Sequence, residues 1–379
     1  MDSRERVFLA LNFEEPDRVP VDFWGSEGFY RSLQQGLDKA AFLDRHDVDF
    51  RYIEGPRYVG PPPAVSADGI RTDIWGVPRQ TVRVPTQFGE EIYQEVARSP
   101  LAAAQTAEEI DAYAHWPSPD WFDYGPVKAQ CEAIRSKGRV AVFMGDRLNR
   151  VAQLKPAMYL RGVERIFMDL AEAPEIAQAI LRHLRRFYVE YLSRVLEAAD
   201  GGVDIVVTGD DFGSQNAPLL SPAMWRQFLG DGFEEYMTII RTGGARSMHH
   251  TCGRVTPLVG EMAARGLQIL QSLQPEAMAA DYAFLKSTYG RRLAFQGGVS
   301  IQQTLPRGTP EQVREEVRRR VETLAPGGGY ILCTAHNIQA DCPPANVEAL
   351  LQAYRQEGKR CHPRRNGTEE YHVRQSGDT

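Results

Sequence analysis

The sequence of 379 residues predicts an α/β fold, a closed (β/α)8 barrel. Eight short runs rich in Val, Ile and Phe recur along the chain, and most are followed by a stretch with helical spacing. Parallel strands need helical crossovers, and eight such strands close into a barrel whose interior is filled by side chains. A doubly wound open sheet is the alternative.

The expected strands are runs of four to seven residues. In chain order they lie at 18–23, 49–53, 140–144, 203–208, 245–250, 267–273, 293–296 and 329–333. From Glu175 onward apolar residues fall three or four apart, which predicts a long helix with one buried stripe. Ser221 before Pro222 predicts another helix start, and Thr309 with Gln312 predicts a capping box.

One stretch, residues 54–121, breaks the alternation of strands and helices. The Asp68-Gly69 turn signal and the alternating run at 92–96 predict a small antiparallel β insertion after strand 2. A short helix is expected to begin at Thr106, with Glu109 as its capping partner. An excursion of this length in a compact barrel is usually a lid or a partner surface.

A single barrel domain is expected over residues 1–357, with the insertion inside it. Residues 358–379 are polar, have almost no aliphatic side chains, and are expected to form a tail outside the core.

Composition excludes several classes of protein. The 44 basic and 50 acidic residues give a net charge of −6, without the basic excess that an electrostatic nucleic-acid binder needs. No segment approaches the roughly eighteen apolar residues of a membrane span. The N-terminus is charged and has no apolar run behind it, so we expect no secretory signal and a cytoplasmic location. The five cysteines are too few for a disulfide framework and favour free thiols or metal ligands.

Polar residues gather just past the predicted strands. In barrels of this class the loops at the carboxyl ends of the strands build the active site, so these residues are expected to meet. They are Asp146, Arg147, Asp210, Asp211, His250, Cys252, Gln274, His336 and Asn337.

His250 and Cys252 carry the clearest chemical signal. Residues two apart at the end of a strand point the same way, and nitrogen with sulfur ligation is what zinc prefers. The predicted eighth strand offers a third ligand, either Cys333 or His336. Three protein ligands with one open position is the pattern of a catalytic zinc site. The alternative interpretation is a core histidine beside a small buried cysteine.

Two carboxylates and one arginine are the other catalytic candidates. Asp210 and Asp211 fit a general acid and base pair, or carboxylates that hold a metal-bound histidine in one tautomer. Either could instead cap the turn that follows the strand. Arg147 could bind an anionic substrate group through two hydrogen bonds, or pair with a neighbouring aspartate in the barrel mouth.

Several motifs together resemble the uroporphyrinogen decarboxylase superfamily. They are Arg4-Glu5-Arg6-Val7 with Asp17-Arg18-Val19-Pro20-Val21, Thr72-Asp73-Ile74-Trp75-Gly76, His250-Thr251-Cys252-Gly253 and Pro343-Pro344-Ala345-Asn346-Val347. The likeness runs from the first helix to about Tyr354. It implies a TIM barrel that is either a tetrapyrrole decarboxylase or a cobalamin-dependent methyltransferase.

The motifs favour the methyltransferase branch. Decarboxylases of the superfamily carry an Arg-Gln-Ala-Gly-Arg element after the first strand, whereas residues 23–30 here contain no arginine. The zinc methyltransferases carry His-x-Cys, which matches His250 and Cys252. Their third ligand is a cysteine in a Gly-Cys-Gly element, where this sequence has Ala335-His336-Asn337, so His336 takes that place with Cys333 as the fallback.

The resemblance implies zinc and a corrinoid that a partner protein carries. The reaction would move a methyl group between that cobalamin and a small-molecule thiol acceptor or methyl donor. A histidine in place of a thiolate ligand makes zinc a stronger Lewis acid, which favours activation of a methyl donor. The alternatives are a metal-independent decarboxylase that uses Asp210 or Asp211 to hold pyrrole N–H groups, and a non-catalytic corrinoid-binding protein.

Overall fold

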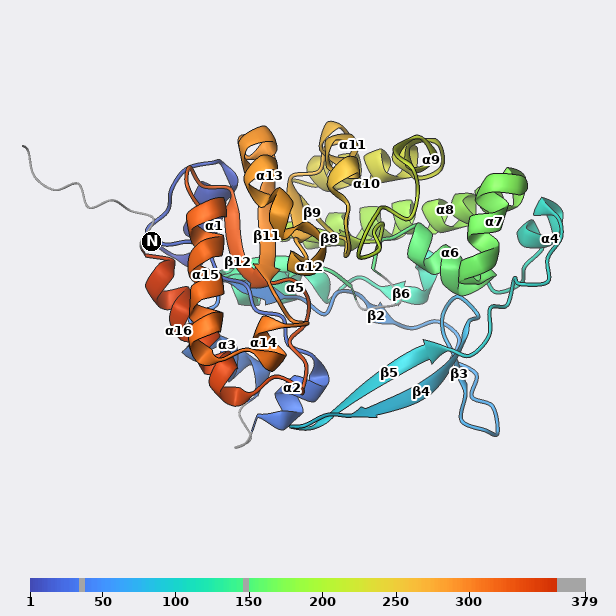
Figure 1. Ribbon diagram of the computed structural model, residues 1–379. Helices are drawn as coiled ribbons and strands as arrows, with labels where there is room; N and C mark the ends of the chain where they lie inside the picture. Colours follow the sequence, from blue (N-terminus) through green and yellow to red (C-terminus); the bar gives the residue numbers. More distant parts are fainter. Residues whose placement is uncertain (34–37, 146–149, 360–379) are drawn as a thin grey trace, which may run out of the picture.

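The computed structural model describes residues 1–33, 38–145 and 150–359 of the chain. At its centre lies a curled parallel sheet in the order β1-β7-β8-β9-β10-β11-β12 (Figure 1). The strands are β1 Phe50–Tyr52, β7 Val140–Phe143, β8 Ile205–Gly209, β9 Arg246–His250, β10 Ile269–Ser272, β11 Ala294–Val299 and β12 Tyr330–Thr334. Each lies within a few residues of a predicted strand, which confirms the α/β class and the parallel connections.

The predicted first strand, residues 18–23, is not one of these seven strands. It forms an isolated parallel bridge in which Val21 pairs with Leu332 of β12. The carbonyl of Pro20 accepts a hydrogen bond from the N–H of Leu332, but Pro20 has no N–H of its own to donate. The N–H of Val21 donates to the Asp49 carboxylate at 2.8 Å and not to a neighbouring strand. A regular ladder therefore cannot form here, and the predicted eight-stranded closed barrel is corrected to a seven-stranded sheet.

Helices cover the outer face of this sheet (Figure 1). The longer ones are α1 Ser3–Leu11, α5 Val127–Arg135, α6 Leu154–Arg161, α7 Val163–Glu172, α8 Pro174–Ala199, α10 Asp231–Thr242, α13 Tyr282–Tyr289, α15 Pro310–Leu324 and α16 Pro344–Glu357. The shorter ones are α2 Glu27–Ser32, α3 Lys39–Arg45, α4 Ala107–Asp111, α9 Pro222–Trp225, α11 Val259–Ala264, α12 Pro275–Met278 and α14 Thr304–Arg307. The structure confirms the long helix α8, the Ser221 cap of α9 and the capping box of α15 between Thr309 and Gln312.

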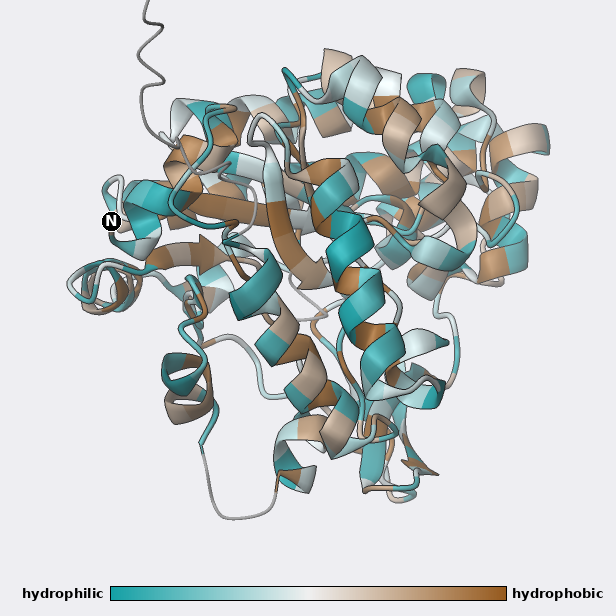
Figure 2. Cartoon of the chain, turned by 60° about the vertical axis from the view of Figure 1, so that its left-hand side comes forward, coloured by the Kyte–Doolittle hydropathy of each residue, from teal (hydrophilic) through white to brown (hydrophobic). Residues whose placement is uncertain are grey.

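Apolar side chains fill the amino-terminal end of the sheet. Figure 2 shows hydrophobic strands at the centre and helices with hydrophilic outer faces. The first residues of the strands, among them Phe50, Val140 and Ile331, pack with Val7 and Leu11 of α1. Helix α1 thus closes this end, and polar side chains are left for the opposite end, where the strands stop.

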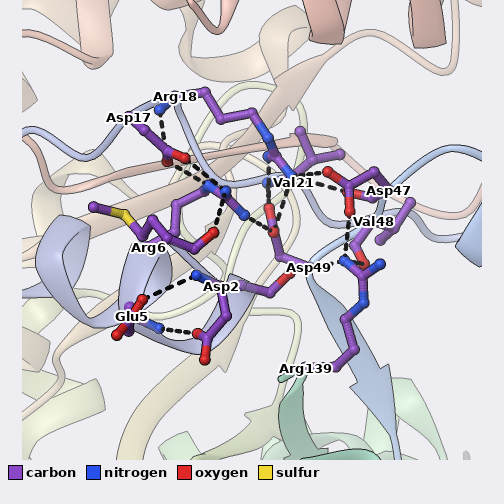
Figure 3. A network of polar contacts seen from close by, with 12 residues as sticks. Asp2, Glu5, Arg6, Asp17, Arg18, Val21, Asp47, Val48, Asp49 and Arg139 are labelled. Carbon is purple, nitrogen blue, oxygen red and sulfur yellow. Dashed lines mark hydrogen bonds and ion pairs between the residues drawn. The ribbon is translucent and has the colours of Figure 1, made fainter. Parts of the chain in front are cut away.

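An ion network fastens α1 to this closed end (Figure 3). Arg6 donates to both carboxylate oxygens of Asp17, at 2.6 and 2.8 Å, and to Asp49 at 2.8 Å. Arg18 donates to Asp49 at 2.7 Å and to Asp47 at 2.9 Å. Two arginines therefore share the buried carboxylate of Asp49, which directly precedes β1.

The antiparallel insertion is present as predicted. It comprises β2 Arg57–Tyr58 paired with β6 Phe122–Asp123, and β3 Arg71–Thr72, β4 Pro78–Pro85 and β5 Glu90–Val96 in a three-stranded sheet. Thr106 caps α4 by accepting the N–H of Glu109. The Glu91 carboxylate of β5 accepts bonds from the Ser26 hydroxyl at 2.6 Å and the Ala340 N–H at 2.8 Å. These bonds hold the insertion against the loop after β12.

Over the described ranges 1–33, 38–145 and 150–359, no helix is both long and apolar enough to cross a bilayer.

Candidate metal centre

Three predicted ligands meet where β9 and β12 end. His250 is the last residue of β9, Cys252 follows two residues later, and His336 lies two residues past β12. One ligand atom from each lies within 4.8 Å of the other two, so the group could bind a metal ion. Cys333 is not part of this group, although both Cys333 and His336 were candidates for the third ligand. Of the two candidates, His336 is the one whose ligand atom lies close to those of His250 and Cys252.

The distance between the donor atoms of Cys252 and His250 fits a zinc ion. A tetrahedral zinc ion at about 2.3 Å from sulfur and about 2.1 Å from nitrogen separates those two atoms by roughly 3.6 Å. The Sγ atom of Cys252 lies 3.6 Å from Nε2 of His250. The rings of His250 and His336 have their centroids 5.3 Å apart. The donor set of two imidazoles and one thiol therefore suits a zinc ion that keeps one coordination position open.

A glycine at position 253, directly after Cys252, is required by a close approach of two loops. Gly253 has φ +81°, and a Cβ atom there would lie 2.3 Å from the backbone of Gly213 in the loop after β8. Only glycine tolerates both conditions. The intervening Thr251 points its hydroxyl to the N–H of Phe212, at 3.0 Å. The backbone thus places the side chain of Cys252 beside that of His250.

A buried glutamine orients His250. Gln271 of β10 is 0% exposed and lies directly opposite His250 in the parallel ladder. Its Oε1 atom contacts Nδ1 of His250. Because an amide oxygen only accepts, Nδ1 carries the proton and Nε2 presents its lone pair to the metal position. The sequence interpretation missed Gln271, whose only signal is a polar residue inside the apolar run Ile269-Leu270-Gln271.

Asp211 lies next to the ligands, as predicted. Its Oδ1 atom is 3.7 Å from Nε2 of His250 and accepts the N–H of Cys252 at 3.2 Å, while Lys155 donates to Oδ2 at 2.6 Å. Burial works to raise the pKa of Asp211, but the Lys155 ammonium and the Cys252 N–H favour the charged carboxylate and hold that pKa below its usual range. Burial and the Asp211 charge raise the pKa of the Cys252 thiol to about 12. A bound metal ion would reverse this and favour the thiolate.

The metal-ligand group separates two cavities. The larger, the insertion-side cavity, has a volume of about 450 Å³ and is bordered by His250 and His336. The smaller, the loop-side cavity, has about 320 Å³ and is bordered by Cys252, His336 and the loops after β8, β10 and β11. The insertion and α6 supply most of the other walls of the larger cavity, including Trp75, Arg79, Tyr93, Lys155 and Tyr159. Molecules in either cavity can therefore reach the metal ligands.

Comparison with known families gives one clear match. The profile of the uroporphyrinogen decarboxylase (URO-D) family matches residues 73–357, which is most of the chain and includes all three metal-ligand residues. The chain belongs to the uroporphyrinogen decarboxylase family.

Individual members of the family are distant relatives. Uroporphyrinogen decarboxylase of Psychromonas ingrahamii is 26% identical over 184 residues, 48% of each chain. The protein of that name from Coxiella burnetii (strain RSA 493) is 26% identical over 191 residues, again 48% of each chain. This chain therefore spans about half the length of these curated relatives. The match to Pseudomonas syringae uroporphyrinogen decarboxylase is longer, at 23% identity over 71% of this chain and 75% of the relative.

A solved structure shows the same fold over nearly the whole chain. A methyltransferase from Methanosarcina mazei superposes with a TM-score of 0.64 and 18% identity, covering 94% of this chain and 98% of that one. At 18% identity this likeness shows that the two proteins share a fold.

Asp210 and Arg147 are the other two catalytic candidates in this URO-D family chain. The carboxylate of Asp210 accepts the N–H groups of Gln153 (2.6 Å), Leu154 (3.1 Å) and Lys155 (2.6 Å) at the start of α6. Burial raises the pKa of Asp210 to about 6. The structure thus places Asp210 in a capping position. Arg147 lies outside the described residues.

Asp22 is a second buried polar residue near the metal ligands that the sequence interpretation missed. Asp22 accepts bonds from the Tyr52 hydroxyl at 2.6 Å, the Trp24 indole at 2.9 Å and the Gln296 amide. Burial raises the pKa of Asp22, and the Trp24 ring lies 5.6 Å from the His250 ring. The available signal was an acidic residue inside the apolar run 19–24.

Proposed function

We propose that the protein is a zinc-dependent methyltransferase that moves a methyl group between a corrinoid carried by a partner protein and a small-molecule thiol acceptor or methyl donor. The observation that carries this proposal is the group of His250, Cys252 and His336, with ligand atoms within 4.8 Å of one another beside two cavities. When bound there, zinc supplies Lewis acidity to the oxygen or sulfur of the small molecule.

The residues of the chain define the character of this site. One thiol and two imidazoles give a ligand set with a single negative charge once Cys252 is deprotonated. Gln271 holds the proton of His250 on Nδ1 through a neutral amide, which adds no further charge. A metal ion with so little charge compensation polarises a bound group strongly, which favours the direction that activates a methyl donor.

The segment 23–30, which leads into α2, favours methyl transfer over decarboxylation. In decarboxylases of the superfamily this region holds substrate carboxylates through arginines. Here Ser26 caps α2 and binds Glu91 of the insertion, and the segment 23–30 supplies no arginine. The region is therefore used to attach the insertion. A cavity of about 450 Å³ also suits a small molecule better than a whole tetrapyrrole.

Metal analysis tests the proposal directly. Wild type, Cys252→Ala, His336→Ala and Cys333→Ala are purified without chelator and assayed for zinc and for methylcobalamin-dependent methylation of a thiol. We expect about one zinc per chain in wild type and in Cys333→Ala, the matched control, and loss of both zinc and activity in the other two variants. Full methyl transfer by zinc-free protein would contradict the proposal, and turnover of a porphyrinogen by such protein would support the decarboxylase instead.

A further inference from the structure

Arg79 of β4 is a buried arginine with unused donors. It is 3% exposed and borders the insertion-side cavity. Its Nε atom donates to Asp73 at 2.8 Å, but neither of its two terminal nitrogens has a hydrogen-bond partner. A guanidinium stays protonated at any pH that a protein survives, so these N–H groups are permanent donors. Burying them without an acceptor is unfavourable.

A second unused donor lies beside the first. The ring of Tyr159, from α6, lies 4.3 Å from the Arg79 guanidinium carbon. The Tyr159 hydroxyl is also buried without a partner, and the residue borders the same cavity. Two elements that are far apart in sequence thus bring unsatisfied donors to one wall.

The two terminal nitrogens of Arg79 indicate which kind of ligand would bind there. Asp73 uses only Nε, so the two terminal nitrogens remain as a fork that matches the two oxygens of a carboxylate. Trp75 and Tyr93 border the same cavity and suit an apolar body. Three glutamates, Glu27, Glu91 and Glu95, also border this cavity, and Glu91 is bound to Ser26 and Ala340. Arg150 and Lys155 add positive charge to the same walls.

We propose that Arg79 and Tyr159 bind the carboxylate of a small organic acid that occupies the insertion-side cavity. His250 and His336 border that cavity too, so the acid is the methyl donor or acceptor, an assignment that rests on the function proposed above. One end of the reactant is held by the insertion, and its other end reaches the metal ligands.

Binding of matched acids and amides tests this without any catalytic assay. Benzoate, phenylacetate and hexanoate are each compared with their primary amide by calorimetry on the full-length protein as purified. We expect at least one acid to bind at least about tenfold more tightly than its amide, because only the acid pairs with the fork. Acids that bind no better than amides to wild type would overturn the proposal, as would inorganic phosphate that binds more tightly than every acid.

Three variants locate the effect. Arg79→Gln is expected to weaken acid binding by about tenfold and leave amide binding unchanged, and Tyr159→Phe to weaken it by about threefold. Arg83→Gln, an exposed arginine on the same strand, is the control and is expected to bind as wild type. Unchanged acid binding in a folded Arg79→Gln protein would overturn the proposal. Since no zinc or corrinoid is involved, failure of the methyltransferase assay and failure of this site are separate results.

Discussion

Arg6 and Arg79 are two buried arginines at opposite ends of the fold, and they are bound very differently. Arg6, near the closed end, makes charge-assisted bonds to Asp17 and Asp49 through all three of its nitrogens (Figure 3). Arg79, at the mouth, uses one nitrogen on Asp73 and leaves two without a partner. A saturated arginine fixes structure, whereas an unsaturated one is available to a ligand.

The same contrast holds for the acids. Asp49 at the closed end is bound by two arginines, while Asp22, nearer the metal ligands, is surrounded by neutral donors from Tyr52, Trp24 and Gln296. This agrees with the division seen in barrels of this class, in which one end serves stability and the other carries the site.

The largest effect is expected at the closed end. Arg6→Met leaves the buried carboxylate of Asp49 with one arginine fewer and should lower the free energy of unfolding by about 3–5 kcal/mol. Urea unfolding measures this. Arg57→Met, which removes a pair with Asp123 whose arginine is 72% exposed, is the control, with a change within about 0.5 kcal/mol. Equal losses in the two variants would break the comparison.

At the mouth, Gln271 should act on metal binding rather than on folding. Gln271→Leu removes the acceptor that holds His250 Nδ1 and is expected to weaken zinc binding by about 10- to 100-fold. Gln271→Glu keeps an acceptor and should bind zinc at least as well as wild type. Competition with a chromogenic chelator reports both. Wild-type zinc affinity in Gln271→Leu would show that the amide does not position His250.

Removing Arg79 should affect stability less than removing Arg6. Arg79→Met removes one buried ion pair, with Asp73 at 2.8 Å, where Arg6→Met removes the pairs with both Asp17 and Asp49. Asp73 keeps the N–H groups of Trp75 at 2.8 Å and Val77 at 3.0 Å. We expect the free energy of unfolding to fall by about 2–3 kcal/mol in urea. A loss as large as that of Arg6→Met would mean that Arg79 is a structural residue.

The last effect concerns pH. Burial holds the pKa of Asp22 in the folded protein above its ordinary value. The stability that the protonated carboxyl contributes is therefore complete below the pKa of the unfolded chain and is lost as pH rises through the pKa of the folded protein. Asp22→Asn cannot titrate. Wild type should therefore lose stability relative to the variant as pH rises above about 4, the ordinary pKa of an aspartate, in thermal or urea unfolding. A gap that stays constant, or that changes in the opposite sense, would contradict the raised pKa.

Much of the fold was predictable because it depends on local patterns. Apart from β9, the strands from β7 to β12 are short and mostly apolar, and α15 carries its own capping box, so neighbours in sequence define them. The segment 18–23 has a similar composition but does not form a regular strand. Pro20 lacks an N–H, and the N–H of Val21 donates to the side chain of Asp49 and not to a strand. Asp49 is far away in sequence, and no local pattern contains it.

The site divides in the same way. His250 and Cys252 were predictable because alternate residues at a strand end share a direction. The choice of His336 over Cys333 depends on the loop after β12, where the Thr334 hydroxyl binds the His336 carbonyl at 2.7 Å. The orienting role of Gln271 depends on strand pairing, which a sequence pattern does not contain.

The position of His336 between two cavities has a consequence for reaction order. Since a molecule in the insertion-side cavity does not fill the loop-side cavity, one reactant need not leave before the other enters. The proposed methyl transfer would then proceed through a ternary complex, and initial-rate plots against the two reactants are expected to intersect rather than run parallel. In the proposed reaction, one imidazole ring that borders both cavities would thus bear on the order of substrate binding as well as on the metal.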